Sequence, residues 1–202
     1  MLDGRFEWAC SEIGTFGVRA AELVPLGSIV WFPCPKCPRW TVSERQDLST
    51  GVDSRLDSWG YPLFDGSLLV PCSGAQMINH SCDPTVLNVG LDFGIAVRDI
   101  EAGQEVTVDY SAFDTNETRS MHCSCRASAC RIEISTLDAT NPAMLRKWSE
   151  QLKPAVDAMR KVDQPLGSYL SRWSQCFRDL RAGSSLSELS CGDSVVRPGF
   201  CS

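Results

Sequence analysis

The chain has 202 residues, of which 43% are hydrophobic and 22% charged, which suits one soluble globular domain with an appendage or at most two small domains. The formal net charge of −6 is unevenly spread: residues 1–135 carry 10 basic and 18 acidic side chains (net −8), and residues 136–202 carry 9 and 7 (net +2). We therefore expect no direct nucleic-acid binding, which usually needs a basic patch, whereas a cationic peptide would be attracted to the acidic part.

Membrane and export signals are not visible in the sequence. No apolar run is long enough to span a bilayer, and residues 1–16 show no signal-peptide pattern. We therefore expect no membrane association and an intracellular location, in the cytoplasm or the nucleus. The sequence leaves the oligomeric state open.

The first part of the chain is predicted to form short strands. Residues 5–32 (RFEWACSEIGTFGVRAAELVPLGSIVWF) read as short strands with glycine turns, and SIVWF (28–32) is a β-rich apolar run. Residues 41–67 are polar and rich in Gly, Asp and Ser, which predicts a loop-rich insert with at most a short helix near residues 43–48.

More strands are predicted after this insert. SLLVP (67–71) is another short apolar run, and residues 86–91 and 94–100 (VLNVGL and GIAVRDI) alternate as a hairpin does. The turn EAGQ separates this hairpin from a further predicted strand, EVTVDY (105–110).

The pattern changes to helical after residue 135. Asn141 is a predicted N-cap with Pro142 at the first helical position, and Pro154 is expected to kink or split the helix that follows. A second amphipathic segment at 166–180 completes a predicted helical hairpin, whose apolar faces favour packing. The apolar positions are Leu145, Trp148, Leu152, Val156, Met159, Leu166, Tyr169, Leu170, Trp173, Phe177 and Leu180.

Three of the eleven cysteines form a pattern that is typical of a metal site. Cys123, Cys125 and Cys130 follow one another as C-x-C-x4-C. In a reducing compartment such a cluster favours tetrahedral zinc, which needs one more ligand. By spacing alone this fourth ligand is any remote cysteine or His122.

A second pair of cysteines is less informative. Cys34 and Cys37 (Cys-Pro-Lys-Cys) would need two partners to bind a metal ion, for example Cys10 and Cys72, and the spacing selects neither. A redox pair is the other alternative. We expect free or buried thiols here.

Four segments in chain order then point to a family. They are IGTFGVRAAELVPLGSIV (13–30), MINHSCDPTV (77–86), EVTVDYSAF (105–113) and CSCRASAC (123–130). Together, over about Phe6 to Ile132, they resemble the SET-domain methyltransferases, which are mostly protein lysine methyltransferases that use S-adenosylmethionine. The C-x-C-x4-C run resembles the post-SET zinc element of that family.

The resemblance implies a mostly β fold, the SET-domain β-clip of short sheets with a pseudoknot, which becomes α+β overall with the C-terminal helical hairpin. It divides the chain into a SET catalytic domain (1–114, with the insert at about 41–67), a post-SET zinc element (115–135), a helical flank (136–181) and a tail (182–202) that is expected to be flexible because it is rich in Ser and Gly.

The resemblance also implies a cofactor site and a zinc site. Its cofactor is S-adenosylmethionine, and Cys82 becomes the fourth Zn²⁺ ligand beside Cys123, Cys125 and Cys130. The residues implied to hold the cofactor are Phe16, Gly17, Asn79, His80 and Tyr110. Thr15 stands where the family usually has the first glycine of a Gly-x-Gly motif.

By the same resemblance the Tyr110 hydroxyl lies beside the transferred methyl group and the lysine amine. Val108 lies where many relatives carry a Phe or Tyr that controls the number of methyl groups, and Phe113 is expected to line the lysine channel. Tyr61 is a candidate for a further wall of this channel, from the insert. We expect Trp31, Trp40 and Trp59 to be core residues rather than channel residues.

The sequence thus predicts an S-adenosylmethionine-dependent protein lysine N-methyltransferase that acts on a lysine of a histone tail or another protein. One alternative is a SET-fold enzyme for a small-molecule amine, and another is a catalytically silent, zinc-stapled interaction module. A zinc-binding structural protein that binds no S-adenosylmethionine is the remaining alternative.

Overall fold

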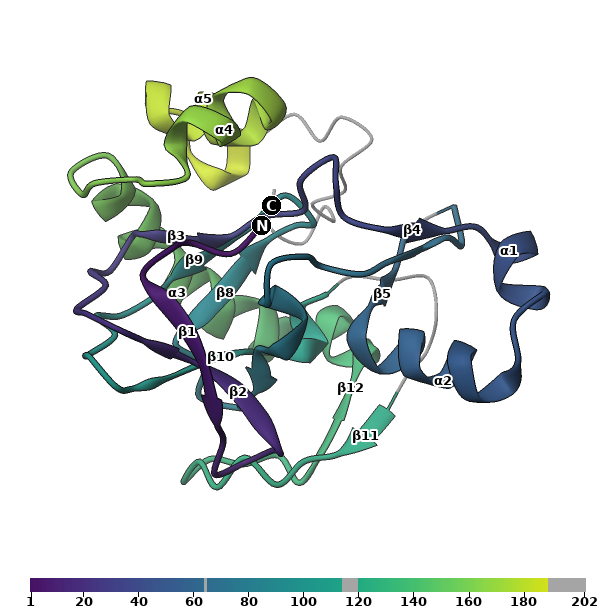
Figure 1. Ribbon diagram of the computed structural model, residues 1–202. Coiled ribbons are helices and arrows are strands. Elements are labelled where there is room, and N and C mark those ends of the chain that lie inside the picture. Colours follow the sequence, from purple (N-terminus) through teal and green to yellow (C-terminus); the bar gives the residue numbers. More distant parts are fainter. Residues whose placement is uncertain (64, 114–119, 189–202) are drawn as a thin grey trace.

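The computed structural model describes residues 1–63, 65–113 and 120–188, and the fold is α+β, with several short sheets and C-terminal helices (Figure 1). The main sheet has the strand order β1-β2-β10-β8-β9-β3, and β7 pairs with β10 outside this path. The strands are β1 (Phe6–Cys10), β2 (Phe16–Ala20), β3 (Ile29–Trp31), β7 (Asn79–His80), β8 (Val86–Val89), β9 (Phe93–Ala96) and β10 (Glu105–Val108). The predicted hairpin is confirmed as the antiparallel pair β8–β9.

Strand β10 brings the sequence motifs together. It pairs antiparallel with β2 through Glu105 and Arg19, and parallel with β7, where Thr107 lies opposite Asn79 and Val108 opposite His80. Parallel strands need a long connection, so this pairing joins segments that are far apart in the sequence. The buried valines of β10 anchor the strand in the core.

The insert at 41–67 differs from the expectation of a loop with at most a short helix. It holds the predicted short helix as α1 (Val42–Gln46), but also a ten-residue helix, α2 (Thr50–Trp59). Helix α2 has no buried residue, so it lacks the apolar periodicity by which a helix is recognised in a sequence. It is stabilised instead by Arg45, which forms ion pairs with Asp53 and Asp57, one turn apart on α2.

A small sheet closes the base of the insert. Its strand order is β4-β6-β5, and the strands are β4 (Arg39–Trp40), β6 (Leu68–Leu69) and β5 (Tyr61–Pro62). The chain therefore leaves the core after β4 and returns to it at β5, where Tyr61 is buried (Figure 1). The 3-10 helices η1 (Ala75–Met77) and η2 (Tyr110–Ala112) follow β6 and β10.

The chain continues into a two-stranded sheet and the helical flank. Strands β11 (Ser120–His122) and β12 (Glu133–Ser135) pair antiparallel around the last three cysteines of the metal motif. The helices that follow are η3 (Thr136–Thr140), α3 (Pro142–Met159), α4 (Gly167–Trp173), α5 (Gln175–Ala182) and η4 (Leu186–Glu188). The predicted Asn141 cap and Pro142 start of α3 are confirmed, because the Asn141 side chain accepts the Ala143 N–H.

Two details of these helices differ from the sequence-based expectation. Of the two expected effects of Pro154, the split is wrong, because α3 is one continuous helix, and the kink stays a prediction; Pro154 is exposed, so water can hydrogen-bond the carbonyl that lacks an N–H partner. The second predicted helix is instead divided at Ser174, whose side chain caps α5 through the Phe177 N–H. Helix α5 ends at Ala182, and within the predicted flexible tail residues 189–202 lie outside the described residues.

Among the residues that the structure describes, no helix has the length and apolar composition needed to cross a membrane. Helix α3 instead packs on the main core through Trp148, Leu152, Val156 and Met159, which are all buried. Gly27 allows this close approach, since a Cβ atom there would lie 2.6 Å from the Met159 nitrogen.

We expect Gly27→Ala to lower the free energy of unfolding by about 3 kcal/mol or more, because the residue has φ +88° and the new Cβ would meet helix backbone that cannot move aside. The matched control is Gly103→Ala, which has φ +79° but open space around its Cβ, and which should lose only about 1–2 kcal/mol. Denaturant titration measures both values. Equal losses in the two variants would show that α3 is not packed tightly on Gly27.

Candidate active site and metal centre

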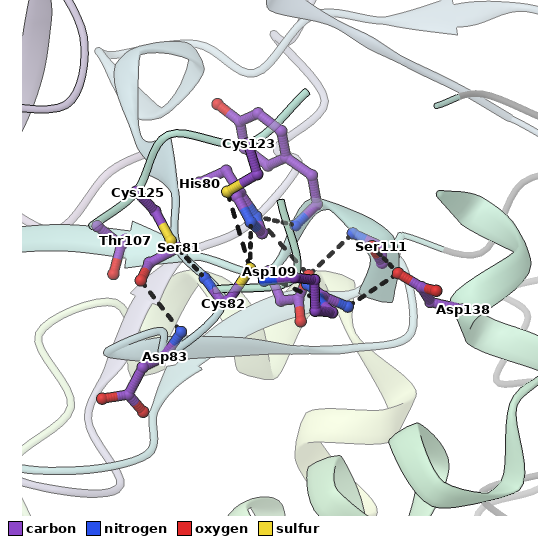
Figure 2. Close-up of polar contacts among 12 residues, drawn as sticks. His80, Ser81, Cys82, Asp83, Thr107, Asp109, Ser111, Cys123, Cys125 and Asp138 are labelled. Atoms are coloured by element: carbon purple, nitrogen blue, oxygen red, sulfur yellow. Dashed lines mark hydrogen bonds and ion pairs between the residues drawn. The ribbon is translucent and has the colours of Figure 1, made fainter. Parts of the chain in front are cut away.

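Cys123 and Cys125 of the metal motif lie beside Cys82, although about 40 residues separate them from it in the sequence (Figure 2). The Cys82 and Cys123 sulfurs lie 3.7 Å apart, and the Cys130 sulfur lies 3.6 Å from that of Cys123. The ligand atoms of His80, Cys82, Cys123 and Cys125 all lie within 4.8 Å of one another. His122, an alternative left open by spacing alone, is exposed on β11 and is not in this group.

The hydrogen bonds of His80 decide which of its nitrogens carries the proton. Its Nδ1 accepts the Tyr110 N–H at 3.1 Å, and its Nε2 lies 3.4 Å from the Cys82 sulfur. Burial lowers the pKa of His80 to about 4, so the imidazole is neutral at physiological pH. Because Nδ1 is the acceptor, Nε2 carries the hydrogen and donates it to Cys82, which leaves Nε2 without a lone pair for a metal ion.

The cluster favours the thiolate form of Cys125. Burial alone would raise its pKa, but the backbone N–H groups of Cys82 and Ala127 and the neighbouring thiols donate hydrogen bonds and lower the pKa to about 6. Since the thiolate is the metal-binding form of cysteine, this arrangement suits a metal ligand.

A buried ion pair lies beside the cluster and was not predicted from the sequence. The Asp109 carboxylate is completely buried and accepts hydrogen bonds from Arg131 Nη2 at 2.6 Å, Trp148 Nε1 at 3.1 Å and the Ser111 N–H at 3.1 Å. Arg131 also pairs with Asp138, which in turn accepts the Ser111 hydroxyl (Figure 2). The sequence feature that could have identified Asp109 is its position directly before Tyr110.

Arg131 also contacts the metal cluster directly. Its backbone N–H and its Nε lie 3.3 and 3.4 Å from the Cys82 sulfur. The negative charges of Asp109 and Cys82 outweigh the effect of burial and raise the pKa of Arg131, so the guanidinium stays charged. This residue directly follows Cys130 in the sequence, so adjacency to the motif is the signal that could have identified it.

Three of the residues predicted to hold the cofactor, Phe16, Gly17 and Asn79, lie together at the start of β2, whereas His80 and Tyr110 lie beside Cys82 and the Ile78 carbonyl. The Asn79 side-chain amide donates hydrogen bonds to the Phe16 carbonyl at 2.8 Å, Glu105 Oε1 at 2.8 Å and Ser11 Oγ at 3.1 Å. Gly17 fits because it has no Cβ, which would lie 2.5 Å from Glu105 Oε1. Glu105 and Ser11, which sequence reasoning missed, thus hold Asn79 against the Phe16 turn.

A surface hollow of about 340 Å³ lies next to this turn. The residues that line it are Glu12, Ile13, Gly14, Thr15, Ser124 and Arg126. It therefore lies between the glycine turn of the first motif and the loop that carries Cys123 and Cys125. One acidic and one basic side chain border it.

Tyr110 borders a different, apolar space. Its hydroxyl donates a hydrogen bond to the Ile78 carbonyl at 2.8 Å, and burial raises the pKa of Tyr110 to about 12, so the phenol stays protonated. The cavity beside it has a volume of about 430 Å³, within the range of ligand sites. It is lined by Trp31, residues 57–62, Pro71, Ala75, Gln76, Ile78, Val108, Tyr110, Ser111, Phe113, Ser120, Met121 and residues 134–136.

Three aromatic rings form one wall of this cavity. The rings of Tyr61 and Phe113 lie 4.9 Å apart, and Trp31 lies 6.1 Å from Phe113 and 6.2 Å from Tyr61. Trp31 is both a core residue and a cavity residue, whereas Trp59, expected in the core, is 47% exposed and lines the cavity. The reason is that Trp59 ends α2, a helix without a buried face.

Comparison with protein-family models finds that residues 15–111 match the SET domain. These residues are a SET domain, so the resemblance seen in the sequence is confirmed, and the cysteine and histidine cluster after it suggests a post-SET-like zinc site. SET domains are typical of S-adenosylmethionine-dependent protein lysine methyltransferases. A search of curated proteins finds no match to the chain.

The buried ion pair leads to a stability prediction. Arg131→Met would leave the Asp109 carboxylate buried without its cation, and we expect the free energy of unfolding to fall by about 3–5 kcal/mol. Arg98→Met is the matched control, because Arg98 pairs with Asp83 at the surface and its loss should amount to less than about 1 kcal/mol. Denaturant titration of both variants would contradict this account if they were equally stable.

Proposed function

We propose that this chain is an S-adenosylmethionine-dependent protein lysine N-methyltransferase that uses Tyr110 to align the reacting groups. The observation that carries the proposal is the position of Tyr110. Its hydroxyl is fixed by the Ile78 carbonyl at the wall of an apolar cavity, and its backbone N–H fixes His80 on the neighbouring strand. The same residue therefore joins the cavity to the strand that carries the cofactor motif.

The cavity suits the side chain of a lysine. Tyr61, Phe113 and Trp31 offer apolar surface to its aliphatic stem, and Val108 narrows the space little because it is small. An ordinary lysine amine has a pKa near about 10.4 and must lose its proton before it can attack. An apolar channel favours the neutral amine because it offers little solvation to the ammonium ion.

The raised pKa of Tyr110 limits the role of this residue. A phenol with a pKa of about 12 is almost entirely protonated at neutral pH. The phenolate that could accept a proton is therefore very scarce, and Tyr110 does not carry away the lysine proton. The Tyr110 hydroxyl donates its hydrogen bond to the Ile78 carbonyl oxygen. The lone pairs of the hydroxyl oxygen stay available to orient the polarised methyl group of the cofactor and the lysine amine. The lysine proton then leaves to water before transfer.

The chain offers groups that fit S-adenosylmethionine, which supplies the electrophilic methyl group. Glu12 and Arg126, of opposite charge, border the hollow and match the ammonium and carboxylate groups of its amino-acid end. We propose that the Phe16–Gly17 backbone, Asn79 and His80 complete this site. The Asn79 amide N–H groups are already occupied by the protein, so Asn79 acts mainly by shaping the turn.

The acidic catalytic part supports a basic protein substrate. Residues 1–135 carry a net charge of −8, which would attract a lysine-rich segment such as a histone tail. The first substrates to offer are therefore core histones, with a cell lysate to identify other proteins and a set of small amines to test the alternative substrate class.

We expect Tyr110→Phe to reduce methyl transfer by on the order of 100-fold while cofactor affinity changes little, because only the hydroxyl that orients the reacting groups is lost. Transfer of labelled methyl from S-adenosylmethionine to protein measures the rate, and calorimetry measures cofactor binding. The matched control is Tyr169→Phe, an exposed tyrosine of α4, which should keep the full rate.

The outcomes of this assay separate the candidate functions. Label on a protein lysine that disappears in Tyr110→Phe supports the proposal, and label only on small amines supports the alternative enzyme. Equal rates for wild type and Tyr110→Phe would remove this residue from the mechanism. Cofactor binding without label on any substrate would favour a silent interaction module.

We propose that one Zn²⁺ ion is held by Cys82, Cys123, Cys125 and Cys130, with His80 as a hydrogen-bond donor to Cys82. Four thiolates complete a tetrahedral structural site. The neutral imidazole of His80 carries its hydrogen on Nε2 and donates it to the Cys82 sulfur. Ligands of structural zinc sites are commonly oriented by such hydrogen-bond donors. This ion would join the SET domain to the β11–β12 sheet.

The competing ligand set, with His80 in place of Cys130, is separated by two variants. Cys130→Ser should lower the zinc-to-protein ratio by one, and His80→Asn should leave the ratio unchanged, because only Cys130 supplies a ligand atom. Elemental analysis of protein purified without chelator gives both ratios. A loss of one ion in His80→Asn with none in Cys130→Ser would reverse the assignment.

A further inference from the structure

A second cluster of thiols lies apart from the centre described above. The sulfurs of Cys34, Cys37 and Cys72 all lie within 4.8 Å of one another, with Cys34 at 3.4 Å from Cys72 and 3.9 Å from Cys37. Cys34 and Cys37 are buried and Cys72 is half-buried. The expectation from the sequence was a pair of free or buried thiols, and the structure adds Cys72 as a third member but not Cys10, which is exposed.

The chain path explains why these thiols meet. Cys34 and Cys37 are separated by two residues in a tight turn, closed by a hydrogen bond from the Cys37 N–H to the Cys34 carbonyl at 2.9 Å. Such C-x2-C spacing is common in zinc-binding loops. Cys72 follows β6, which pairs with β4, so the small sheet brings Cys72 back to the turn.

An unpaired buried hydroxyl points independently to a missing ligand. Tyr61 is only 7% exposed, and its hydroxyl has no hydrogen-bond partner within the described parts of the chain. Tyr61 lies on β5, which pairs with β6, and Cys72 follows β6 in the chain. An unsatisfied buried donor costs about 1–3 kcal/mol, which an acceptor at the cluster would relieve.

We propose that Cys34, Cys37 and Cys72 bind a second Zn²⁺ ion, whose fourth ligand is a water molecule. Thiolate sulfur is a soft ligand that zinc binds well, and three protein ligands plus water form an established tetrahedral arrangement. The half-buried Cys72 gives the ion access to water. Each thiol releases one proton on binding, so the three negative charges are largely offset by the ion.

The ion would have a structural effect on the cavity. Cys34 and Cys37 precede the insert and Cys72 follows it, so one ion ties both ends of the segment that carries α1, α2 and Tyr61. Residues 57–62 of this segment and Pro71 line the cavity beside Tyr110. The consequence for substrate binding rests on the proposed function, whereas the metal site itself does not.

The test is a count of zinc per chain in wild type, Cys72→Ser and Cys10→Ser, the exposed-thiol control. We expect Cys72→Ser to hold one ion fewer than wild type and Cys10→Ser to hold the same number. This difference is independent of the first zinc site and of methyl transfer. A Cys72→Ser protein that is folded by circular dichroism and keeps the wild-type ratio overturns the proposal.

Alkylation of the wild-type protein tests the same site without a substitution. We expect iodoacetamide to modify Cys10 at once, and to modify Cys34, Cys37 and Cys72 only after a chelator removes the ion, as read from peptide masses. Immediate alkylation of all three would overturn the proposal. So would a peptide that links Cys34 to Cys72 by a disulfide in the purified protein, since that bond removes two of the ligands.

Discussion

The buried carboxylate of Asp109 is the group on which the rest of the structure depends. Burying a carboxylate is costly in free energy unless its charge is paired and its oxygens accept hydrogen bonds. Arg131 supplies the opposite charge, and Trp148 and the Ser111 N–H donate hydrogen bonds. These partners come from the loop after Cys130, α3 and η2. The segment after β10, the cysteine cluster and the helical flank are therefore held together at one point, directly beside Tyr110.

Strand β10 provides the second constraint, because it is the neighbour of both other motifs. Its pairing with β2 positions Glu105 next to the Phe16 turn, and its pairing with β7 positions Val108 opposite His80. The charged hollow near Arg126 and the apolar cavity near Phe113 share no lining residue. Methyl transfer needs separate spaces for cofactor and substrate, since both must approach the same carbon atom from opposite sides.

Much of this could be predicted from the sequence where local patterns were strong. The alternation of β8 and β9 and the cap at Asn141 are local signals, and both were read correctly. Helix α2 was missed because none of its residues is buried, so it has no apolar periodicity, and it is stabilised by ion pairs with Arg45. The Asp109–Arg131 pair and the meeting of Cys72 with Cys34 are contacts between distant segments, which no spacing rule encodes.

The central claim is that cofactor and lysine meet at the Tyr110 hydroxyl from two separate openings. A crystal structure with S-adenosylhomocysteine and a lysine peptide tests it most directly. The account predicts the amino-acid end of the cofactor between Glu12 and Arg126, its sulfur facing the Tyr110 hydroxyl, and the lysine side chain among Tyr61, Phe113 and Trp31. A lysine bound outside this aromatic wall, or a cofactor sulfur turned away from Tyr110, would contradict the account.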